Sequence, residues 1–452
     1  MKKILQFIIL FFIIIFLMTV SLVMVSFIPR SAIQKKSKES ADYILENNEN
    51  YYNLIKENTS DTRTYLQFGD YSKVDQYADT ISLSMAYYLN SDHPLESVLW
   101  ARYYDGRKDT EAPVTMMEGY AKSVKENTPT NMQYMRYWHG NLVFIRLLLT
   151  VMKLKQMKLF HEGLIMAGII ALVYIIKKRG YMKEGICFVV SMIAVSVWFV
   201  PISLEYTWMF LLMLLVSIIA VKLSSDGNSY ERIEQRLQIL LFLLGMFAAY
   251  LDFLTTETIT LLIPLLLAIR ILFQREDLQE DVSNKNIIKL VVVCVFLWGI
   301  GYVLTWTSKW ALSALVFQEN VIPYIQDNIM LRIGTFDSSP ILQQYFGCLK
   351  RNIFPLFPFG YGMYGGVFFL LFAIVIVFLI YRSNMVLRKE INWVRILLYF
   401  LLGSIVYIRF FVMLSHSYGH YFFTYRAQAA SVLALCFMIL EIVEFRRVEK
   451  KK

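Results

Sequence analysis

The chain carries a series of apolar stretches that are long enough to cross a bilayer and are separated by short charged loops. A spanning helix needs about 20 predominantly apolar residues. With 57% hydrophobic and 18% charged residues among 452, the chain is too apolar for an ordinary soluble protein. The pattern predicts an all-α polytopic membrane protein with about ten transmembrane helices, at residues 4–28, 159–176, 184–200, 204–222, 237–251, 257–274, 287–306, 364–381, 394–412 and 428–444.

Basic residues predict which loops face the cytoplasm. Ten crossings put both termini on one side, and the loops rich in Lys and Arg fall on the side of Lys2 and Lys3. The opposite loops, around 201–205 and 250–257, carry neither residue. Anionic lipid at the cytoplasmic surface therefore accounts for the net charge of +10 without any nucleic-acid partner. We expect a multi-pass plasma-membrane protein with cytoplasmic N- and C-termini and a retained first helix.

One apolar stretch, at 141–152, is too short to span. If it crossed, every later basic loop would move to the outer side, so we expect it to lie along the outer surface. The predicted organisation is an anchor helix at 1–28, an extracytoplasmic loop with the interfacial helix at 29–158, transmembrane helices 2–7 at 159–306, a second extracytoplasmic loop at 307–363, and transmembrane helices 8–10 with a basic cytoplasmic tail at 364–452.

Ionisable groups near the predicted outer helix ends are the natural candidates for a functional site, because such groups are costly at membrane depth. Asp252 and Glu257 flank a turn, and Glu205 closely follows Pro201. All the candidates map to the outer leaflet and together predict a polar cavity that opens outward. They are Glu205, Asp252, Glu257, Arg409, His416, His420 and Arg426.

Several of these residues have simpler interpretations. Asp252 is also well placed to stabilise the N-terminal end of the helix that begins near Thr255. Arg409 and Arg426 are equally consistent with binding to outer-leaflet headgroups. His416 and His420 have the spacing of a metal-ligand pair on a helix, but no HExxH motif accompanies them.

Common motifs of other protein classes are absent. The sequence contains no phosphate-binding GxxxxGK[ST] loop, no GxGxxG after a strand and no GxSxG elbow. ATP-driven transport, a nicotinamide domain and a serine hydrolase therefore lack support. Three of the four cysteines fall within apolar stretches, so no disulfide framework is expected.

Two short segments of the first outer loop carry a resemblance to a known family. The acidic segment Tyr77-Ala78-Asp79 leads into an apolar run, and Tyr137-Trp138-His139-Gly140 precedes the interfacial stretch. In order and spacing, residues 70–280 resemble the GT-C superfamily of membrane glycosyltransferases, of the protein O-mannosyltransferase and aminoarabinose-transferase kind. The family acid usually comes sooner after the first helix and often as Asp-Glu, whereas Asp79 is followed by Thr80. The second segment lacks the prolines of the family element.

The resemblance implies a sugar transfer on the outer face of the membrane. A polyprenyl-phosphate-linked donor would be held through its phosphate by Lys309, Arg409 or Arg426, and a cell-envelope glycan or lipid would be the acceptor. Asp79 would act as general base. Asp252 would orient the acceptor or help to hold a divalent metal ion, and His139 is a further candidate for contact with substrate.

Two other functions fit the same sequence. One is a transporter or flippase of an envelope precursor, in which Arg409 and Asp252 would line a path. The other is a non-catalytic envelope assembly protein whose segment 29–158 binds a partner.

Overall fold

The computed structural model describes residues 2–46, 76–357 and 385–445, together with 367, 370, 371 and 374. The predicted all-α class is confirmed, because the described elements are almost entirely helical. Two small antiparallel sheets complete them: β1 (Arg102–Tyr103) pairs with β2 (Met132–Gln133), and β3 (Met385–Leu387) pairs with β4 (Val443–Phe445).

Seven helices of the described part are long and apolar enough to cross a membrane. The last of them, Tyr421–Ile442, combines α19 (Tyr421–Thr424), the 3-10 turn η7 (Tyr425–Gln428) and α20 (Ala429–Ile442). The other six are α1 (Lys2–Ser26), α8 (Leu154–Lys178), α10 (Leu204–Ser225), α11 (Tyr230–Leu251), α13 (Asn284–Phe317) and α17 (Trp393–Val412).

The remaining three predicted spans do not reach this length among the described residues. The segment 184–200 divides into α9 (Met182–Ala194), of 13 residues, and the 3-10 helix η4 (Val197–Ile202). The span predicted at 257–274 is α12 (Thr258–Leu272), of 15 residues. The span predicted at 364–381 lies almost wholly outside the described residues. The total of about ten crossings therefore stays a prediction.

Helix α12 forms the centre of the bundle, since all of its residues are buried. It is held by ion pairs at both ends. At one end, Arg270 pairs with Glu184 of α9 and Glu441 of α20. At the other end, Glu257, directly before α12, pairs with Arg409 of α17. Because removing one partner of a buried pair exposes the other charge to an apolar interior, these contacts fix the position of α12 strongly.

Helices α11 and α13 cross closely through two glycines. A Cβ atom on Gly245 would collide with the carbonyl oxygen of Trp298, and one on Gly301 would collide with that of Phe242. The two backbones can therefore approach each other only because neither position carries a side chain.

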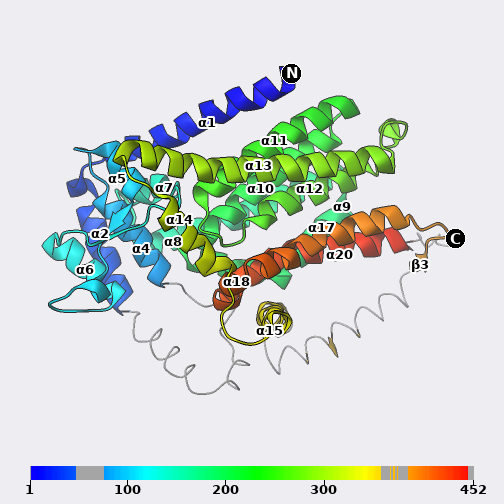
Figure 1. Ribbon diagram of the computed structural model, residues 1–452. Coiled ribbons are helices and arrows are strands. Elements are labelled where there is room, and N and C mark those ends of the chain that lie inside the picture. The colour runs from blue at the N-terminus through cyan, green and yellow to red at the C-terminus, as the bar shows by residue number, and fades with distance from the viewer. Residues whose placement is uncertain are drawn as a thin grey trace.

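The segment predicted to form the first outer loop, where it is described, forms a helical cap at one end of the bundle (Figure 1). Trp138 donates to the carbonyl of Thr305, and Lys309 donates to the carbonyls of Val98 and Leu99, so α13 is tied directly to this cap. Its elements are α2 (Arg30–Glu46), α4 (Gln76–Tyr88), α5 (Pro94–Trp100), η3 (Gly106–Lys108), α6 (Met116–Glu126) and the short α7 (Leu142–Leu148), with β1 and β2.

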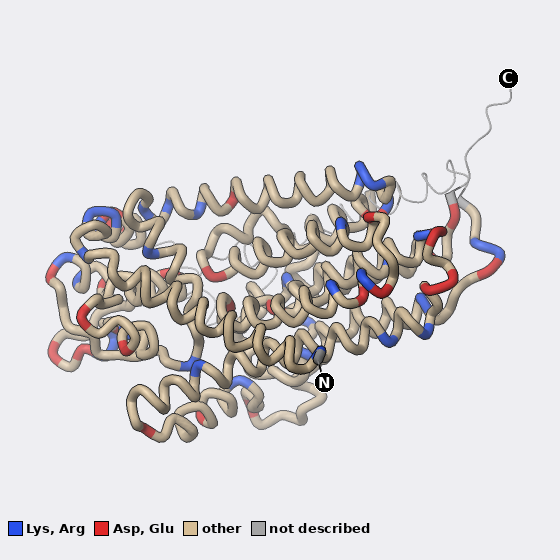
Figure 2. The backbone as a smooth tube through the Cα atoms, turned by 90° about the horizontal axis from the view of Figure 1, so that it is seen from above, with Lys and Arg blue, Asp and Glu red and all other residues tan. Residues whose placement is uncertain are grey.

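Loops that were predicted to be cytoplasmic meet at the opposite end of the bundle. Arg179 lies 2.5 Å from Asp226, and Arg275 donates to the carbonyl of Ser224. The β3–β4 pairing brings the chain before α17 to the end of α20 at this same end (Figure 1). Figure 2 shows most Lys, Arg, Asp and Glu residues at the two ends of the bundle.

The second predicted outer loop, 307–363, is largely helical where it is described. Helix α13 continues to Phe317, beyond its predicted end at 306, because a run of apolar residues follows Lys309. Two shorter helices follow, α14 (Ile322–Ile333) and α15 (Ile341–Ile353). They pack against α18 (Leu414–Gly419), the short helix between α17 and α19.

Candidate functional site

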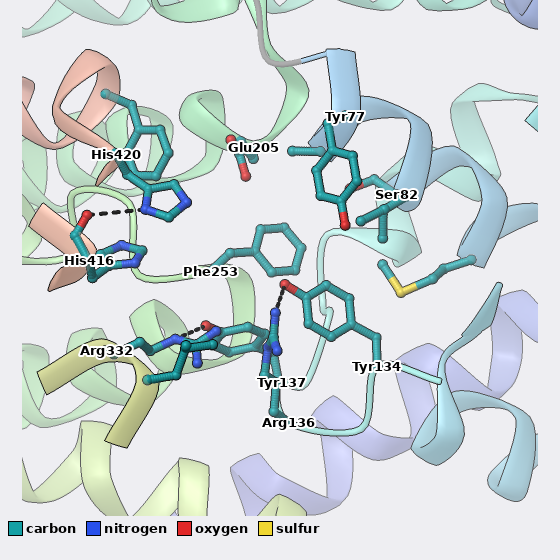
Figure 3. A pocket seen from close by; sticks show the side chains of 15 residues that line it. Tyr77, Ser82, Tyr134, Arg136, Tyr137, Glu205, Phe253, Arg332, His416 and His420 are labelled. Carbon is teal, nitrogen blue, oxygen red and sulfur yellow. Dashed lines mark hydrogen bonds between the residues drawn. The ribbon is translucent and has the colours of Figure 1, made fainter. Parts of the chain in front are cut away.

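A cavity of about 210 Å³ lies at the cap end of the bundle (Figure 3). It is enclosed by segments that are far apart in the sequence: α4, the chain before α7, the start of α10, α14 and α18. Apolar side chains, among them Phe253 and Phe423, make up part of the wall. The polar and aromatic side chains that face it are Tyr77, Ser82, Tyr134, Arg136, Tyr137, Glu205, Arg332, His416 and His420.

Two arginines in this wall are held by neutral groups. Arg136 donates to Oδ1 of Asn328 over 2.7 Å and to the hydroxyl of Tyr134 over 2.6 Å. Arg332 donates to the hydroxyl of Tyr137 over 3.1 Å and to the carbonyl of Asn328 over 2.6 Å. No carboxylate of the described residues forms an ion pair with either guanidinium. The cavity therefore offers two positive charges in fixed positions, an arrangement suited to a phosphate.

The two histidines have defined tautomers, because a backbone carbonyl can only accept. Nε2 of His416 lies 2.8 Å from the carbonyl of Leu254 and so carries its proton. Nδ1 of His420 lies 3.1 Å from the carbonyl of His416, which leaves Nε2 of His420 as an acceptor. That nitrogen points into the cavity (Figure 3). Burial lowers the pKa of both imidazoles, so both are neutral at pH 7.

Glu205 is the acid that faces the cavity (Figure 3). It lies in the first turn of α10, where a negative charge is favoured by the helix dipole. The preceding residue, Leu204, donates its backbone N–H to Oδ1 of Asp79 over 2.7 Å. Asp79 thus fixes the start of α10, and with it the position of Glu205.

The carboxylate of Asp79 is not among the groups that line the cavity. Oδ2 lies 2.6 Å from Nζ of Lys158 on α8, and the Asp79 side chain is fully buried. Burial raises the pKa of Asp79, and the ammonium of Lys158 offsets part of that shift. The carboxylate of Asp79, the predicted base, is therefore occupied by the ammonium of Lys158 and by the backbone N–H of Leu204. Leu204 directly precedes Glu205.

Below the cavity, Arg409 braces the turn between α11 and α12. Its guanidinium lies 2.8 Å from Glu257 and donates to the carbonyl of Leu254 and the hydroxyl of Ser417. Leu254 has a positive φ of 68°, a conformation that needs such support. Asp252 accepts from the backbone and hydroxyl of Thr255 in the same turn. These contacts are those of a structural turn that supports His416.

The other predicted residues lie outside the cavity wall. Lys309 is enclosed beneath the cap, 5.6 Å from the ring of Trp138. Arg426 donates to the carbonyl of Phe422 and lies over the ring of Tyr206. His139 donates from Nε2 to the carbonyl of Tyr134 and thereby orients the segment that carries Tyr134 and Arg136.

The structure therefore brings together only some of the predicted residues. Glu205, His416 and His420 line the cavity. Asp79 instead binds the backbone of Leu204, and Arg409 binds the backbone of Leu254, so both hold segments that carry or contact the cavity residues. Among the described residues, no three His, Cys, Asp or Glu side chains are close enough to hold a metal ion. Polar and aromatic residues of the cavity wall that the sequence did not single out include Tyr134, Arg136 and Arg332, whereas Tyr137 belongs to the Tyr137-Trp138-His139-Gly140 segment.

Arg136 had a sequence signal that could have revealed it, because it directly precedes the Tyr137-Trp138-His139-Gly140 segment. Arg332 had none, since it lies near the end of α14, and the position of α14 beside the cavity depends on its packing against α18.

Comparison with protein-family models, with curated proteins and with solved structures found no match for this chain. The resemblance to membrane glycosyltransferases therefore stays a prediction. A proposal about function has to be argued from the residues of the cavity.

Proposed function

We propose that this protein is a polytopic membrane enzyme that transfers a sugar from a polyprenyl-phosphate donor to a cell-envelope acceptor. The reaction takes place in the cavity, on the outer face of the plasma membrane. The observation that carries the proposal is a combination of groups in one cavity. Arg136 and Arg332 form no ion pair with a carboxylate of the described residues, and Glu205 and Nε2 of His420 are able to accept a proton.

The sidedness of the proposal is supported by the basic loops. Those containing Arg179 and Arg275 lie at the end of the bundle opposite the cavity. With this end in the cytoplasm, as the positive-inside rule favours, the cap and the cavity face outward. The N- and C-termini are then cytoplasmic.

In the proposed reaction, the donor phosphate binds Arg136 and Arg332. Glu205 or His420 accepts the proton of an acceptor hydroxyl while its oxygen attacks the anomeric carbon. The bond between that carbon and the phosphate oxygen breaks, and the polyprenyl phosphate leaves with the electron pair. The two guanidinium groups stabilise the charge that develops on the leaving phosphate. The aromatic rings of Tyr134 and Tyr137 offer a surface for the sugar.

Transport of a precursor is less consistent with the core of the bundle. A transporter places polar groups near the bilayer midplane. Between Thr260 and Arg270, every residue of the central helix α12 is apolar and buried. The charged groups that contact α12 lie near its two ends.

The proposal can be tested with the purified full chain in lipid nanodiscs. We expect a long-chain polyprenyl phosphate to bind more tightly than the uncharged polyprenol. Arg136→Gln and Arg332→Gln should each weaken phosphate binding by about tenfold, the loss of a charge-assisted hydrogen bond. Arg102→Gln removes an exposed charge from the same cap and is the control.

Transfer itself is measured with labelled polyprenyl-phosphate monosaccharides and an envelope extract as the source of acceptors. Wild-type protein should move label into the acceptor fraction. Equal binding of polyprenol and polyprenyl phosphate, or no transfer from any donor tested, would contradict the proposed function.

A further inference from the structure

Helix α15 has its polar face turned inward. Gln344, Cys348 and Asn352, which follow one another at intervals of four residues, are buried. Asn352 accepts from the hydroxyl of Thr424 over 2.7 Å and donates to the carbonyl of Ser417 over 3.0 Å. The side of α15 that faces the bundle therefore consists of hydrogen-bonded polar groups, the reverse of a helix on a soluble protein.

A second face of α15 is apolar and turned outward. Leu342 is 62% exposed and Phe346 66% exposed, and Ile353 continues this face. A third face carries Gln343 and Lys350, which are exposed and polar. Helix α15 thus has one face that packs on the protein, one exposed apolar face and one exposed polar face. This pattern is expected for a helix at the boundary between lipid acyl chains and headgroups.

Helix α14 adds a second apolar surface beside the cavity. No residue of α14 is buried, and Ile322, Ile329 and Ile333 fall on one outward side. Leu331, on another side, lines the cavity and is also 68% exposed. The rim of the cavity at α14 is therefore apolar and open to the surroundings.

The position of α15 fits a location in the outer leaflet. Figure 1 shows α15 end-on while the long helices run across the view, so its axis crosses theirs. It packs against α17 near the cavity end of the bundle, with the hydroxyl of Tyr345 donating to the carbonyl of Tyr407. The exposed apolar side chains of α17, such as Ile408 and Phe411, continue the outward face of α15 into the lipid-facing side of the bundle.

We infer that α14 and α15 form a ledge (residues 322–353) that lies in the outer leaflet, with its apolar faces against lipid chains. Lys350 is placed for the phosphates of the headgroups. The inference extends the proposed function, on which its second part rests: the hydrophobic tail of the donor lies along this ledge and its phosphate reaches Arg332 past Leu331. The substrate class is thereby a phosphate carried on a long lipid chain, taken up sideways from the membrane.

The location of the ledge is tested by spin labels on single introduced cysteines in the full chain in nanodiscs. Leu342→Cys and Phe346→Cys test the apolar face, and Gln343→Cys and Lys350→Cys are matched controls on the same helix. The wild-type chain, labelled in parallel, gives the background from its native cysteines. We expect labels at 342 and 346 to collide more with oxygen than with a water-soluble nickel chelate, and labels at 343 and 350 to show the opposite.

Two results would overturn this location. Equal access of the nickel chelate to 346 and 350 would place α15 in water. Low access of both relaxers at 346, with broadening between labels, would mean that a second copy of the chain covers this face.

The tail is tested with phosphates on a long and on a short prenyl chain. Phe346→Asp should weaken binding of the long-chain phosphate by about tenfold, the loss expected when an apolar contact is replaced by a charge, and leave the short-chain phosphate unaffected. Arg136→Gln should weaken both. If Phe346→Asp weakens both equally or neither, the tail does not lie on the ledge. If neither phosphate binds the wild type, the proposed function fails, while the spin-label result still decides where the ledge lies.

Discussion

The ammonium of Lys158 on α8 lies 2.6 Å from the carboxylate of Asp79 on α4, and this pair joins the cap to a predicted spanning helix. The same carboxylate holds the start of α10 through the backbone N–H of Leu204. Asp79 therefore connects three elements around the cavity.

The two partners of this pair are not equivalent, which gives a first prediction. Lys158→Met leaves a fully buried carboxylate without its cation and should lower the free energy of unfolding by about 3–5 kcal/mol. Asp79→Asn keeps an acceptor for Leu204, and Lys158 retains 14% exposure, so its cost should be smaller. Unfolding in a denaturing detergent series measures both. If Lys158→Met proves the milder change, the carboxylate has another counter-charge.

The close crossing of α11 and α13 predicts a position-specific effect of alanine. Gly301→Ala and Gly245→Ala should each destabilise the protein by about 1–3 kcal/mol, because the new methyl group forces the two backbones apart. Gly299→Ala, two residues away on the same helix, meets nothing within 4 Å and is the control. Melting temperatures in detergent compare the three variants. Equal melting of Gly299→Ala and Gly301→Ala would disprove the close crossing.

Asp252 predicts a pH dependence of stability. Burial and the nearby charge of Glu257 raise the pKa of Asp252 to about 7. Its pKa in the unfolded chain is about 4, so between these values the folded state holds the proton that the unfolded state has lost. Stability should therefore fall as the pH rises from about 4 to about 7, with a contribution from Asp252 of at most about 1.4 kcal/mol per pH unit.

Asp252→Asn removes this titration, and the difference in stability between the wild type and this variant should change over that pH interval. Unfolding at several pH values measures it. A difference that is constant from pH 4 to 7 would show that the carboxyl group keeps an ordinary pKa in the folded protein.

A substitution of His420 is expected to affect sugar transfer without affecting phosphate binding. His420→Gln removes the proton-accepting nitrogen that faces the cavity, and we expect transfer from the polyprenyl-phosphate donor to fall by about 100-fold or more. Binding of polyprenyl phosphate should stay within about twofold of the wild type, because the phosphate is assigned to Arg136 and Arg332. Single-turnover transfer and equilibrium binding measure the two effects. A parallel loss of both would instead make His420 part of the phosphate site, and transfer close to the wild-type rate would assign the proton acceptor to Glu205.

Two features could be predicted from the sequence: the helical class, and which loops lie together at one end of the bundle. Runs of apolar residues and clusters of Lys and Arg are local signals of these features. The contacts of Arg179 with Asp226 bring together loops that had been predicted to share one side. The number of membrane-spanning helices could not be predicted in the same way. The stretch 184–200 is largely apolar after Glu184, yet α9 ends at Ala194 and a 3-10 helix follows.

The site was harder to predict because its members depend on tertiary contacts. Glu205, His416 and His420 were recognisable as ionisable groups at helix ends. The residue type alone did not reveal which of the candidate side chains face the cavity and which hold the surrounding backbone in place. Arg409 and Arg136 are both arginines near the cap end of the bundle, and only packing decides that the first binds Glu257 while the second binds a tyrosine and an asparagine.

The contact of Lys309 with the carbonyls of Val98 and Leu99 has a mechanical consequence. A separation of α5 from α13 would break both hydrogen bonds of the buried Lys309 side chain, at a cost of about 1–3 kcal/mol for each donor left without a partner. The cap and the membrane helices are therefore expected to move as one body. Under the proposed function, substrate would enter and product would leave by displacements of side chains and of α14, without a hinge between α5 and α13.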